Sequence, residues 1–239
     1  MVMCVSVVIP TFNAAKGLPA LLHRLTDGAV DGIVREVIIA DGGSTDETLQ
    51  IAENFGVTLA MGEKGRGQQL QTGARFARGE WLLFIHADTI PAKDWIGEVR
   101  RFIDGDAMQR ENRAGVFQLE FDERNIGASI VSWGAMIRTR IFKLPYGDQG
   151  LLISRRLYDE IGGYGDMSLF EDVDMIERLV KLHGRKALHV FNSPAITSAR
   201  RYNEEGYIRR VIRNFFCIMM YRCGMSMKTI SSFYHGQKR

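Results

Sequence analysis

Three aspartates stand at positions where carboxylates often do chemistry. Asp41 and Asp88 each follow a short apolar run, residues 36–40 and 81–86, and Asp172 comes just ahead of a helical pattern. A carboxylate at the end of a buried strand loses its hydration unless a cation or a hydrogen-bond donor meets it. Ligands of open α/β sheets bind at these strand ends. We therefore predict that the three aspartates belong to one site.

The segment around Asp88 has the side chains of a metal site. His86 and Asp88 lie on the same side of an extended segment, because alternate residues of a strand share a face. An oxygen-rich site that also holds phosphates suits Mg²⁺ or Mn²⁺. His86 could be a second ligand, or it could be an ordinary buried histidine while only Asp88 touches the ion. The residues leave both interpretations open.

Glu171 and Asp172 allow two interpretations as well. They could be ordinary acids at the start of a helix, where the helix dipole favours negative charge. Alternatively, an ionised Asp172 that comes within about 3 Å of a hydroxyl group could take its proton as a general base.

The glycine-rich segment 62–67 carries Lys64 and Arg66, and such a segment can surround a phosphate with N–H groups and positive charge. An ordinary flexible loop explains it equally well. The segment lacks the Gly-Lys-Ser/Thr ending of a P-loop, and the turn after the first strand lacks Gly-x-Gly-x-x-Gly. These absences argue against an ATPase and against a dinucleotide enzyme of the usual kind.

The surrounding pattern predicts the elements that would position these residues. Strands are expected at 5–10, 36–40, 57–61 and 81–85, and helices at 15–26, 49–55 and 68–77, the second capped by Ser44 or Thr45. This alternation predicts a mostly parallel sheet with right-handed crossovers. Farther on we expect a loop at 101–114, an edge strand at 116–121, helices at 126–141, 158–163 and 172–182, and a strand at 187–191.

Composition narrows the class of protein. The chain has 239 residues and a formal net charge of +3, which gives no support to a nucleic-acid partner. Three cysteines without a C-x-x-C spacing favour reduced thiols and a cytoplasmic protein. No apolar run reaches the ~18 residues that a spanning helix needs.

The segment 200–239 mixes arginines with large apolar residues. A basic amphipathic helix can lie on an anionic membrane, which would put the protein at the inner face of the membrane. A helix that covers the core, with its arginines pointing outward, explains the pattern too, and we favour this second interpretation.

Taken together, four segments resemble the family 2 inverting glycosyltransferases of the GT-A fold: residues 8–13, 40–46, 79–88 and 171–172. The segments 146–150 and 197–201 look like a bacterial subgroup of that family whose substrate is unassigned. The resemblance implies an α/β GT-A fold with a mostly parallel sheet and a C-terminal helical segment. It implies one domain over 1–199, with a nucleotide-binding half (1–103) and an acceptor and catalytic-base half (104–199), followed by a helical segment over 200–239.

The resemblance also implies roles for individual residues. The donor nucleotide would lie against Pro10, Thr11, Phe12, Asn13, Asp41, Lys64 and Arg66, with Asp41 bonded to the base. Asp88 would bind Mn²⁺ or Mg²⁺, with His86 as a weaker candidate, and Asp172 would be the catalytic base beside Glu171. The acceptor or phosphate side would include Asp148, Gln149, Arg200 and Arg201. The expected reaction is transfer of a sugar, with inversion, from a nucleoside-diphosphate sugar (a UDP-sugar is favoured) to a hydroxyl, and lipid-linked acceptors are among the candidates.

Two departures from the family pattern keep a second function open. The Asp-Asp-Gly-Ser motif of the family is here Asp41-Gly42-Gly43-Ser44, and its Asp-x-Asp motif is His86-Ala87-Asp88. A degenerate module that binds a nucleotide-sugar without turnover would explain both losses. A nucleotidyltransferase is less favoured, because the first strand is not followed by a Gly-rich loop.

Overall fold

The first half of the chain forms the alternating strands and helices that its sequence predicts. A computed structural model describes residues 4–105 and 112–235; part of the predicted loop at 101–114, and Lys238 and Arg239 of the basic tail, lie outside the described residues. Within that part of the chain, the strands form one sheet in the order β3-β2-β1-β4-β7-β6-β8-β5. The strands are β1 (Val5–Thr11), β2 (Val34–Asp41), β3 (Thr58–Met61), β4 (Trp81–Phe84), β5 (Thr89–Pro91), β6 (Ala114–Phe121), β7 (Leu151–Ser154) and β8 (Leu188–Thr197).

The sheet has a parallel half and a mixed half. β3, β2, β1 and β4 are parallel neighbours, which suits the short, β-branched and almost fully buried sequence of β1. β7 then pairs antiparallel with β4 and β6, and β6 pairs parallel with β8. The prediction of an exposed edge strand at 116–121 is wrong, because β7 and β8 flank β6 and the strand is largely buried.

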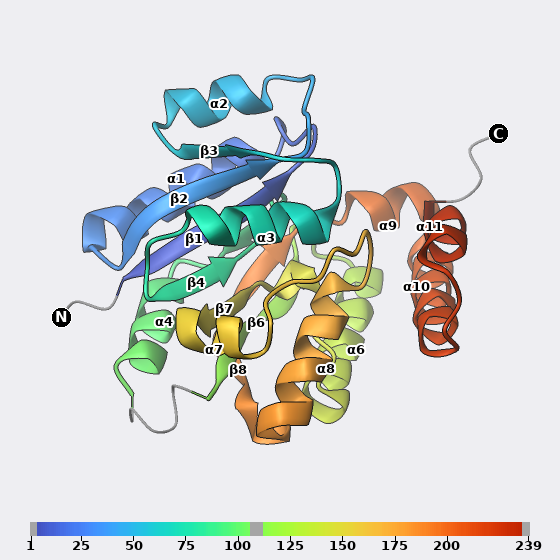
Figure 1. Ribbon diagram of the computed structural model, residues 1–239. Helices are drawn as coiled ribbons and strands as arrows, with labels where there is room; N and C mark the ends of the chain where they lie inside the picture. The colour runs from blue at the N-terminus through green and yellow to red at the C-terminus, as the bar shows by residue number, and fades with distance from the viewer. Residues whose placement is uncertain (1–3, 106–111, 236–239) are drawn as a thin grey trace.

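Helices cover both faces of the sheet (Figure 1). On one face, α1 and α4 pack with β1 and β2 around Trp95, and on the other face α3, α7 and α8 pack with β4 and β7. The helices are α1 (Leu18–Asp31), α2 (Thr48–Asn54), α3 (Arg66–Phe76), α4 (Trp95–Ile103), α6 (Ile126–Phe142), α7 (Arg155–Glu160), α8 (Glu171–His183), α9 (Arg200–Glu205), α10 (Tyr207–Arg222) and α11 (Met227–His235), with 3₁₀ turns η1 (Gly147–Gln149) and η2 (Arg185–Ala187).

The observed helices differ from the predicted ones in several places. The sequence analysis does not predict α4, which extends into the predicted loop at 101–114, although Trp95, Val99 and Ile103 are buried at helical spacing. α1 begins and ends later than predicted, and α7 begins and ends three residues earlier than the predicted helix at 158–163. Ser44 and Thr45 do not cap α2, because the Ser44 hydroxyl bonds to the Asp41 carboxylate instead.

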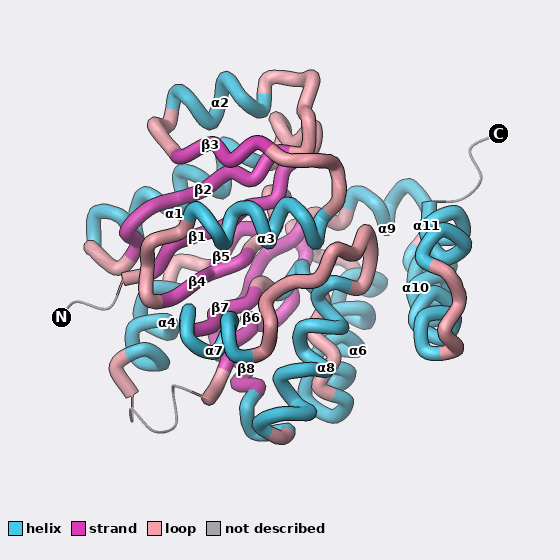
Figure 2. The backbone as a smooth tube through the Cα atoms, viewed as in Figure 1, coloured by secondary structure: helices cyan, strands magenta, loops and turns pink. Residues whose placement is uncertain are grey.

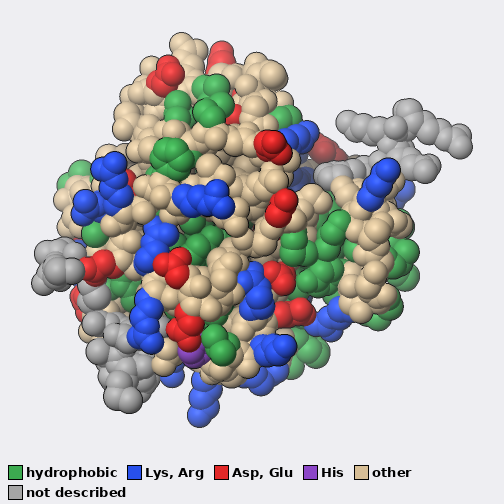
Figure 3. Space-filling model, in the orientation of Figure 1, with side chains coloured by type: hydrophobic (Ala, Val, Ile, Leu, Met, Phe, Trp, Pro, Cys, Tyr) green, Lys and Arg blue, Asp and Glu red, His purple; other side chains and the backbone are tan. Residues whose placement is uncertain are grey.

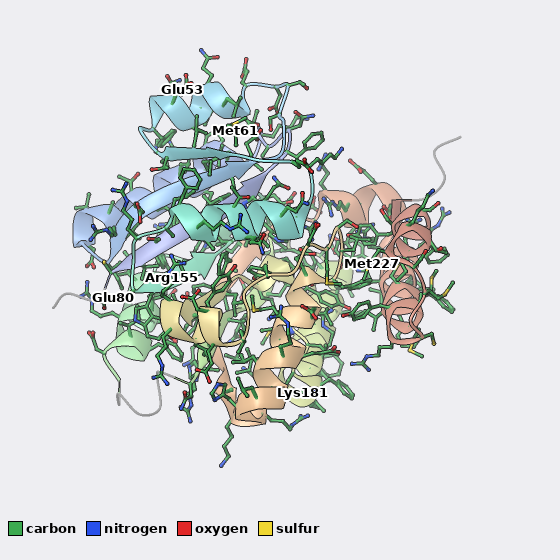
Figure 4. The ribbon with its side chains drawn as sticks, in the orientation of Figure 1. Glu53, Met61, Glu80, Arg155, Lys181 and Met227 are labelled. Carbon is green, nitrogen blue, oxygen red and sulfur yellow. The ribbon has the colours of Figure 1, made fainter. Side chains whose placement is uncertain are left out.

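The C-terminal helices α9, α10 and α11 stand beside the main body, at the right of the view in Figures 1 and 2. Buried Cys217 of α10 and Ile230 of α11 pack with Leu169, in the loop before α8. Met227 extends from α11 toward this body (Figure 4) and joins the same cluster. No helix in the described part of the chain is long and apolar enough to cross a bilayer.

Candidate active site

The strand ends gather the predicted residues into two groups. β1 and β2 end side by side at Thr11 and Asp41, and these two residues begin the first group. β4 ends at Phe84, and His86 and Asp88 follow it. The turn η1 and the start of α8 join this second group, which therefore combines distant parts of the chain.

Asp172 is held by backbone donors beside a cavity. Its Oδ2 accepts a hydrogen bond from the Gly147 N–H at 2.6 Å, and its Oδ1 accepts one from the Val173 N–H at 2.8 Å. Each carboxylate oxygen has a second lone pair, so the group can still accept a proton. Asp172 lines the cavity together with His86 and Glu171.

Gly147 allows His86 and Asp172 to approach one another. A Cβ atom added to Gly147 would lie 2.5 Å from His86 Nε2 and 3.5 Å from Asp172 Oδ2. Burial lowers the pKa of His86 well below its usual value, and the charges of Arg66 and Arg201 lower it further. The imidazole is therefore neutral near pH 7, which is the state that ligates metals.

Glu171 lies buried behind Asp172. Its Oε1 forms an ion pair with Arg66 Nη1 at 3.2 Å, and its Oε2 has no hydrogen-bond partner within the described residues. Burial raises the pKa of Glu171; the charge of Arg66 opposes this rise, and Asp172 adds to it. Arg66 therefore links the start of α3 to the start of α8. A contact of Arg66 with the nucleotide stays a prediction.

Asp148 adds a third acid to this group. Its Oδ1 is buried and lacks a hydrogen-bond partner in the part of the chain that the structure describes. Burial raises the pKa of Asp148 to about 6; Arg138 opposes this rise, and Asp172 and Asp88 contribute to it. Asp148 therefore lies close enough to Asp172 and to Asp88 for the charge of each to disfavour its ionisation.

A half-buried cation, Arg138, also acts on Asp148. The Arg138 guanidinium lies over the Tyr146 ring, 3.3 Å from Cζ to the ring centroid, and its Nε donates to the Leu144 carbonyl at 2.7 Å. Its Nη2 is buried, and it has no partner among residues 4–105 and 112–235. Arg138 was not among the predicted site residues.

The end of β8 brings the arginines after Ser198 close to Asp88. The Ser198 N–H donates to the Asp88 carbonyl at 3.2 Å, while the Asp88 residue itself is exposed. Arg201 is close enough to lower the pKa of His86, so it lies on the site side. Arg200 is exposed at the start of α9, and its role stays a prediction.

The described residues contain no group of three or more His, Cys, Asp or Glu side chains that could hold a metal ion. Asp88 and neutral His86 can still offer one oxygen and one nitrogen. Mg²⁺ is commonly bound by one or two carboxylates while substrate phosphates and water supply the other ligands. The residues therefore fit an ion that binds together with a diphosphate.

Asp41 is fully buried and belongs to the first group. Its Oδ1 accepts hydrogen bonds from the Thr11 and Ser44 hydroxyls at 2.8 and 2.5 Å, and its Oδ2 accepts from the Gly43 and Ser44 N–H groups at 2.8 and 2.7 Å. These four bonds use about all the acceptor positions of a carboxylate. A direct bond from Asp41 to a base, as predicted, requires one hydroxyl to turn away.

Phe12 and its neighbours form the solvent-exposed part of the first group. The Phe12 ring is 42% exposed, and Lys64 Nζ lies over it at 3.8 Å from the centroid. Asn13 has a positive φ of 52° and accepts a hydrogen bond from the Thr45 N–H at 2.8 Å. Pro10 is half-buried in β1. An exposed ring beside a cation can stack on a flat ligand.

Gln149 does not present its side chain to a ligand. It is fully buried, its Nε2 donates to the Phe117 carbonyl at 2.9 Å, and its Oε1 accepts from the Thr139 hydroxyl at 2.8 Å. It therefore connects α6 to β6 and has a structural role. The expectation that Gln149 contacts the acceptor or a phosphate is wrong.

Residues 6–144 of the chain match the family described as Glycosyl transferase family 2. The chain belongs to this family. A glycosyltransferase of PGL/p-HBAD biosynthesis from Mycobacterium bovis is 30% identical over 169 residues, which are 66% of this chain and 62% of the relative. The chain thus spans less than two thirds of the length of that relative. The poly(ribitol-phosphate) β-N-acetylglucosaminyltransferase TarS of Staphylococcus aureus is 31% identical over 106 residues, 41% of this chain and 18% of TarS.

Two solved structures share the fold of this chain. Glucosyl-3-phosphoglycerate synthase of Mycobacterium tuberculosis, crystallised with Mn²⁺, uridine diphosphate and glucosyl-3-phosphoglycerate, superposes with a TM-score of 0.62 at 21% identity and covers 93% of this chain and 81% of its own. S. aureus TarS 1–349 gives a TM-score of 0.61 at 17% identity, over 97% of this chain and 69% of that one. The predicted GT-A fold is therefore confirmed.

Sequence reasoning missed the contacts that join distant segments. Gly147 bonds to Asp172, which lies 25 residues farther along the chain, whereas Arg138 lies over the ring of the nearby Tyr146. The only available signal for Gly147 was its place in the short polar segment that also contains Asp148.

Proposed function

We propose that this chain transfers a sugar from a nucleoside-diphosphate sugar to an acceptor hydroxyl, with inversion at the anomeric carbon. The observation that carries this proposal is the position of Asp172. Two backbone N–H groups orient its carboxylate beside a cavity that neutral His86 also lines, and the exposed Asp88 follows His86 in the chain. The glycosyltransferase relatives support the reaction class.

The donor base would lie against the first group of residues. Phe12 offers an exposed ring and Lys64 a positive charge, while Asp41 holds the turn through Thr11 and Ser44. Asp41 then acts on the base mainly by fixing these hydroxyls. A uridine nucleotide is the favoured donor, because a structural neighbour binds uridine diphosphate.

Asp88 would hold Mn²⁺ or Mg²⁺, with His86 as a second candidate ligand. The bound ion would offset the negative charge of the departing diphosphate. Structural neighbours contain Mn²⁺ or Mg²⁺ together with uridine diphosphate, which supports this cofactor.

Asp172 would take the proton of the acceptor hydroxyl as that oxygen attacks the anomeric carbon. The Gly147 and Val173 N–H groups keep the carboxylate in place during the attack. The ion pair between Arg66 and Glu171 would reduce the repulsion between Glu171 and Asp172. The nucleoside diphosphate leaves from the opposite face, and a single displacement of this kind inverts the anomeric configuration.

Donor hydrolysis tests the proposal without a known acceptor. A thermal-shift screen of nucleoside diphosphates and their sugars with Mn²⁺ identifies the donor, because a ligand of the native state raises the unfolding temperature. Proton NMR then follows the anomeric configuration of the sugar that is first released. With an α-linked donor, we expect the β anomer to form first. Release of the α anomer first would contradict inversion, and binding without any release would favour the nucleotide-sugar-binding module.

A further inference from the structure

Helix α10 is an amphipathic helix whose apolar side faces outward. Six of its large apolar residues recur every one to four positions along one face, whereas Cys217 and Ile218 are buried on the other side. These six are between 42% and 77% exposed: Ile208, Val211, Ile212, Phe215, Phe216 and Met219. We call these six residues the α10 stripe. Figure 3 shows hydrophobic surface at the right-hand edge of the molecule, where α10 and α11 lie.

The opposite side of α10 carries charged groups that would normally face water. Arg210 is only 5% exposed, and its Nη1 bonds to Glu205 Oε1 at 3.0 Å. Arg213 Nη1 bonds to Glu205 Oε2 at 2.8 Å. The expectation that a core-covering helix points its arginines outward is therefore wrong for Arg210 and Arg213. These inner contacts fix the rotation of the helix and keep the stripe exposed.

Helix α6 adds a second exposed apolar row. Ile126, Ile130 and Trp133 are each more than 60% exposed, at the spacing of one helix face. The two helices begin next to each other, because Asn125 Nδ2 donates to the Tyr207 hydroxyl at 3.1 Å. Exposed apolar surface of this extent on a soluble fold marks an interaction site.

The charges around these helices select the partner. α6 contains no Asp or Glu, and no acidic residue follows Glu205 in the sequence. Arg209, Arg222 and Lys228 are exposed on or beside α10. A second copy of the chain would bring basic face against basic face, since the two partners of a symmetric dimer use the same patch. In an anionic bilayer, the α10 stripe could instead insert among the acyl chains, and the surrounding basic residues could bind the negative headgroups.

We propose that the α10 stripe and the exposed row of α6 form a docking surface for an anionic phospholipid bilayer. The protein would lie on the membrane without crossing it. This docking surface lies next to the candidate active site. Tyr234 of α11 is close enough to raise the pKa of Arg66, and its hydroxyl accepts a hydrogen bond from Arg201. Docking would thus hold the site near the headgroups, but it does not depend on the proposed sugar transfer.

Vesicle sedimentation tests this surface with the full chain. We expect the protein to sediment with phosphatidylglycerol-containing vesicles and much less with pure phosphatidylcholine. The double variant Phe215→Asp/Phe216→Asp should lower the partition coefficient at least about tenfold, because apolar burial supplies the binding. The matched control is Val30→Asp on α1, which is 84% exposed on another helix and should bind as the wild type does. Both variants change exposed residues, and unchanged circular-dichroism melting would show that they fold.

Fluorescence gives a second readout of the same surface. Trp81 and Trp95 are buried, so Trp133 is the exposed member of the three tryptophans. Its emission should shift to the blue when anionic vesicles are added, and Trp133→Phe should remove the shift while binding persists. Failure to bind anionic vesicles, binding that the double variant leaves intact, or bound protein without a Trp133 shift would overturn the proposal. The proposal would also be overturned if the wild type formed a dimer in solution that does not bind vesicles, and if the double variant were a monomer.

Discussion

At the residue scale, the site combines acids whose protonation is set by burial. Asp148 is the clearest case, because burial raises its pKa to about 6 and its Oδ1 has no partner within the described residues. A raised folded-state pKa means that the native protein binds a proton more tightly than the unfolded chain does. The associated stability is present below the unfolded pKa of 3.8 and is lost as the pH rises through about 6.

Asp148→Asn should therefore stabilise the metal-free protein at pH 8 and have little effect at pH 4. The isosteric amide removes the cost of ionising a buried acid, which we expect to be of order 1–3 kcal/mol. Urea unfolding of both proteins at the two pH values measures this difference. A variant that is less stable than the wild type at pH 8 would show that the ionised carboxylate is needed by the fold.

Gln149 and Asp148 are sequence neighbours with different roles, and this difference was not visible in the sequence. Gln149 turns inward and satisfies the Phe117 carbonyl, whereas Asp148 faces the acid group. Neighbouring residues of a 3₁₀ turn point in different directions, so the type of residue alone does not assign its partner.

At the scale of elements, the close approach of η1 to the end of β4 and to α8 builds the site. Gly147 allows these elements to lie so close together. Its N–H donates a hydrogen bond to Asp172, and the absence of a side chain leaves room for His86. A second contact, the ion pair between Arg66 and Glu171, connects α3 to α8.

Gly147→Ala should reduce turnover by at least about tenfold while the protein stays folded. The added methyl group would push away the imidazole or the carboxylate, and small displacements of catalytic groups are costly. Gly134→Ala is the matched control, since a Cβ there meets nothing within 4 Å on exposed α6. That change should stabilise the helix by about 0.5–1 kcal/mol without affecting turnover. Equal turnover by Gly147→Ala and Gly134→Ala would contradict the role of Gly147 in positioning His86 and Asp172.

At the scale of the whole molecule, the sequence predicted the parallel half of the fold well. Its short β-branched strands carry local signals, and the structure places His86 and Asp172 beside one cavity, whereas Asp41 lies in a separate group. The mixed half was harder, because the pairing of β6 between β7 and β8 depends on distant segments. The division into domains at residue 199 stays a prediction.

The orientation of α10 was the largest difference between expectation and structure. Its periodicity identifies an amphipathic helix but does not say which face meets the protein. Glu205 and the neighbouring α11 decide that question by binding Arg210 and Arg213 on the inner side.

The most direct test of the central claim compares Asp172→Asn with Asp174→Asn. Both residues lie in the first turn of α8, but Asp174 pairs with Arg178, 2.7 Å away, instead of facing the cavity. The quantity to measure is nucleoside diphosphate release from the donor with Mn²⁺, alongside donor affinity by calorimetry. We predict that Asp172→Asn loses about 10²–10⁴-fold in turnover with donor affinity unchanged, whereas Asp174→Asn stays near the wild type. Turnover of Asp172→Asn within about twofold of the wild type would contradict the assignment of Asp172 as the base.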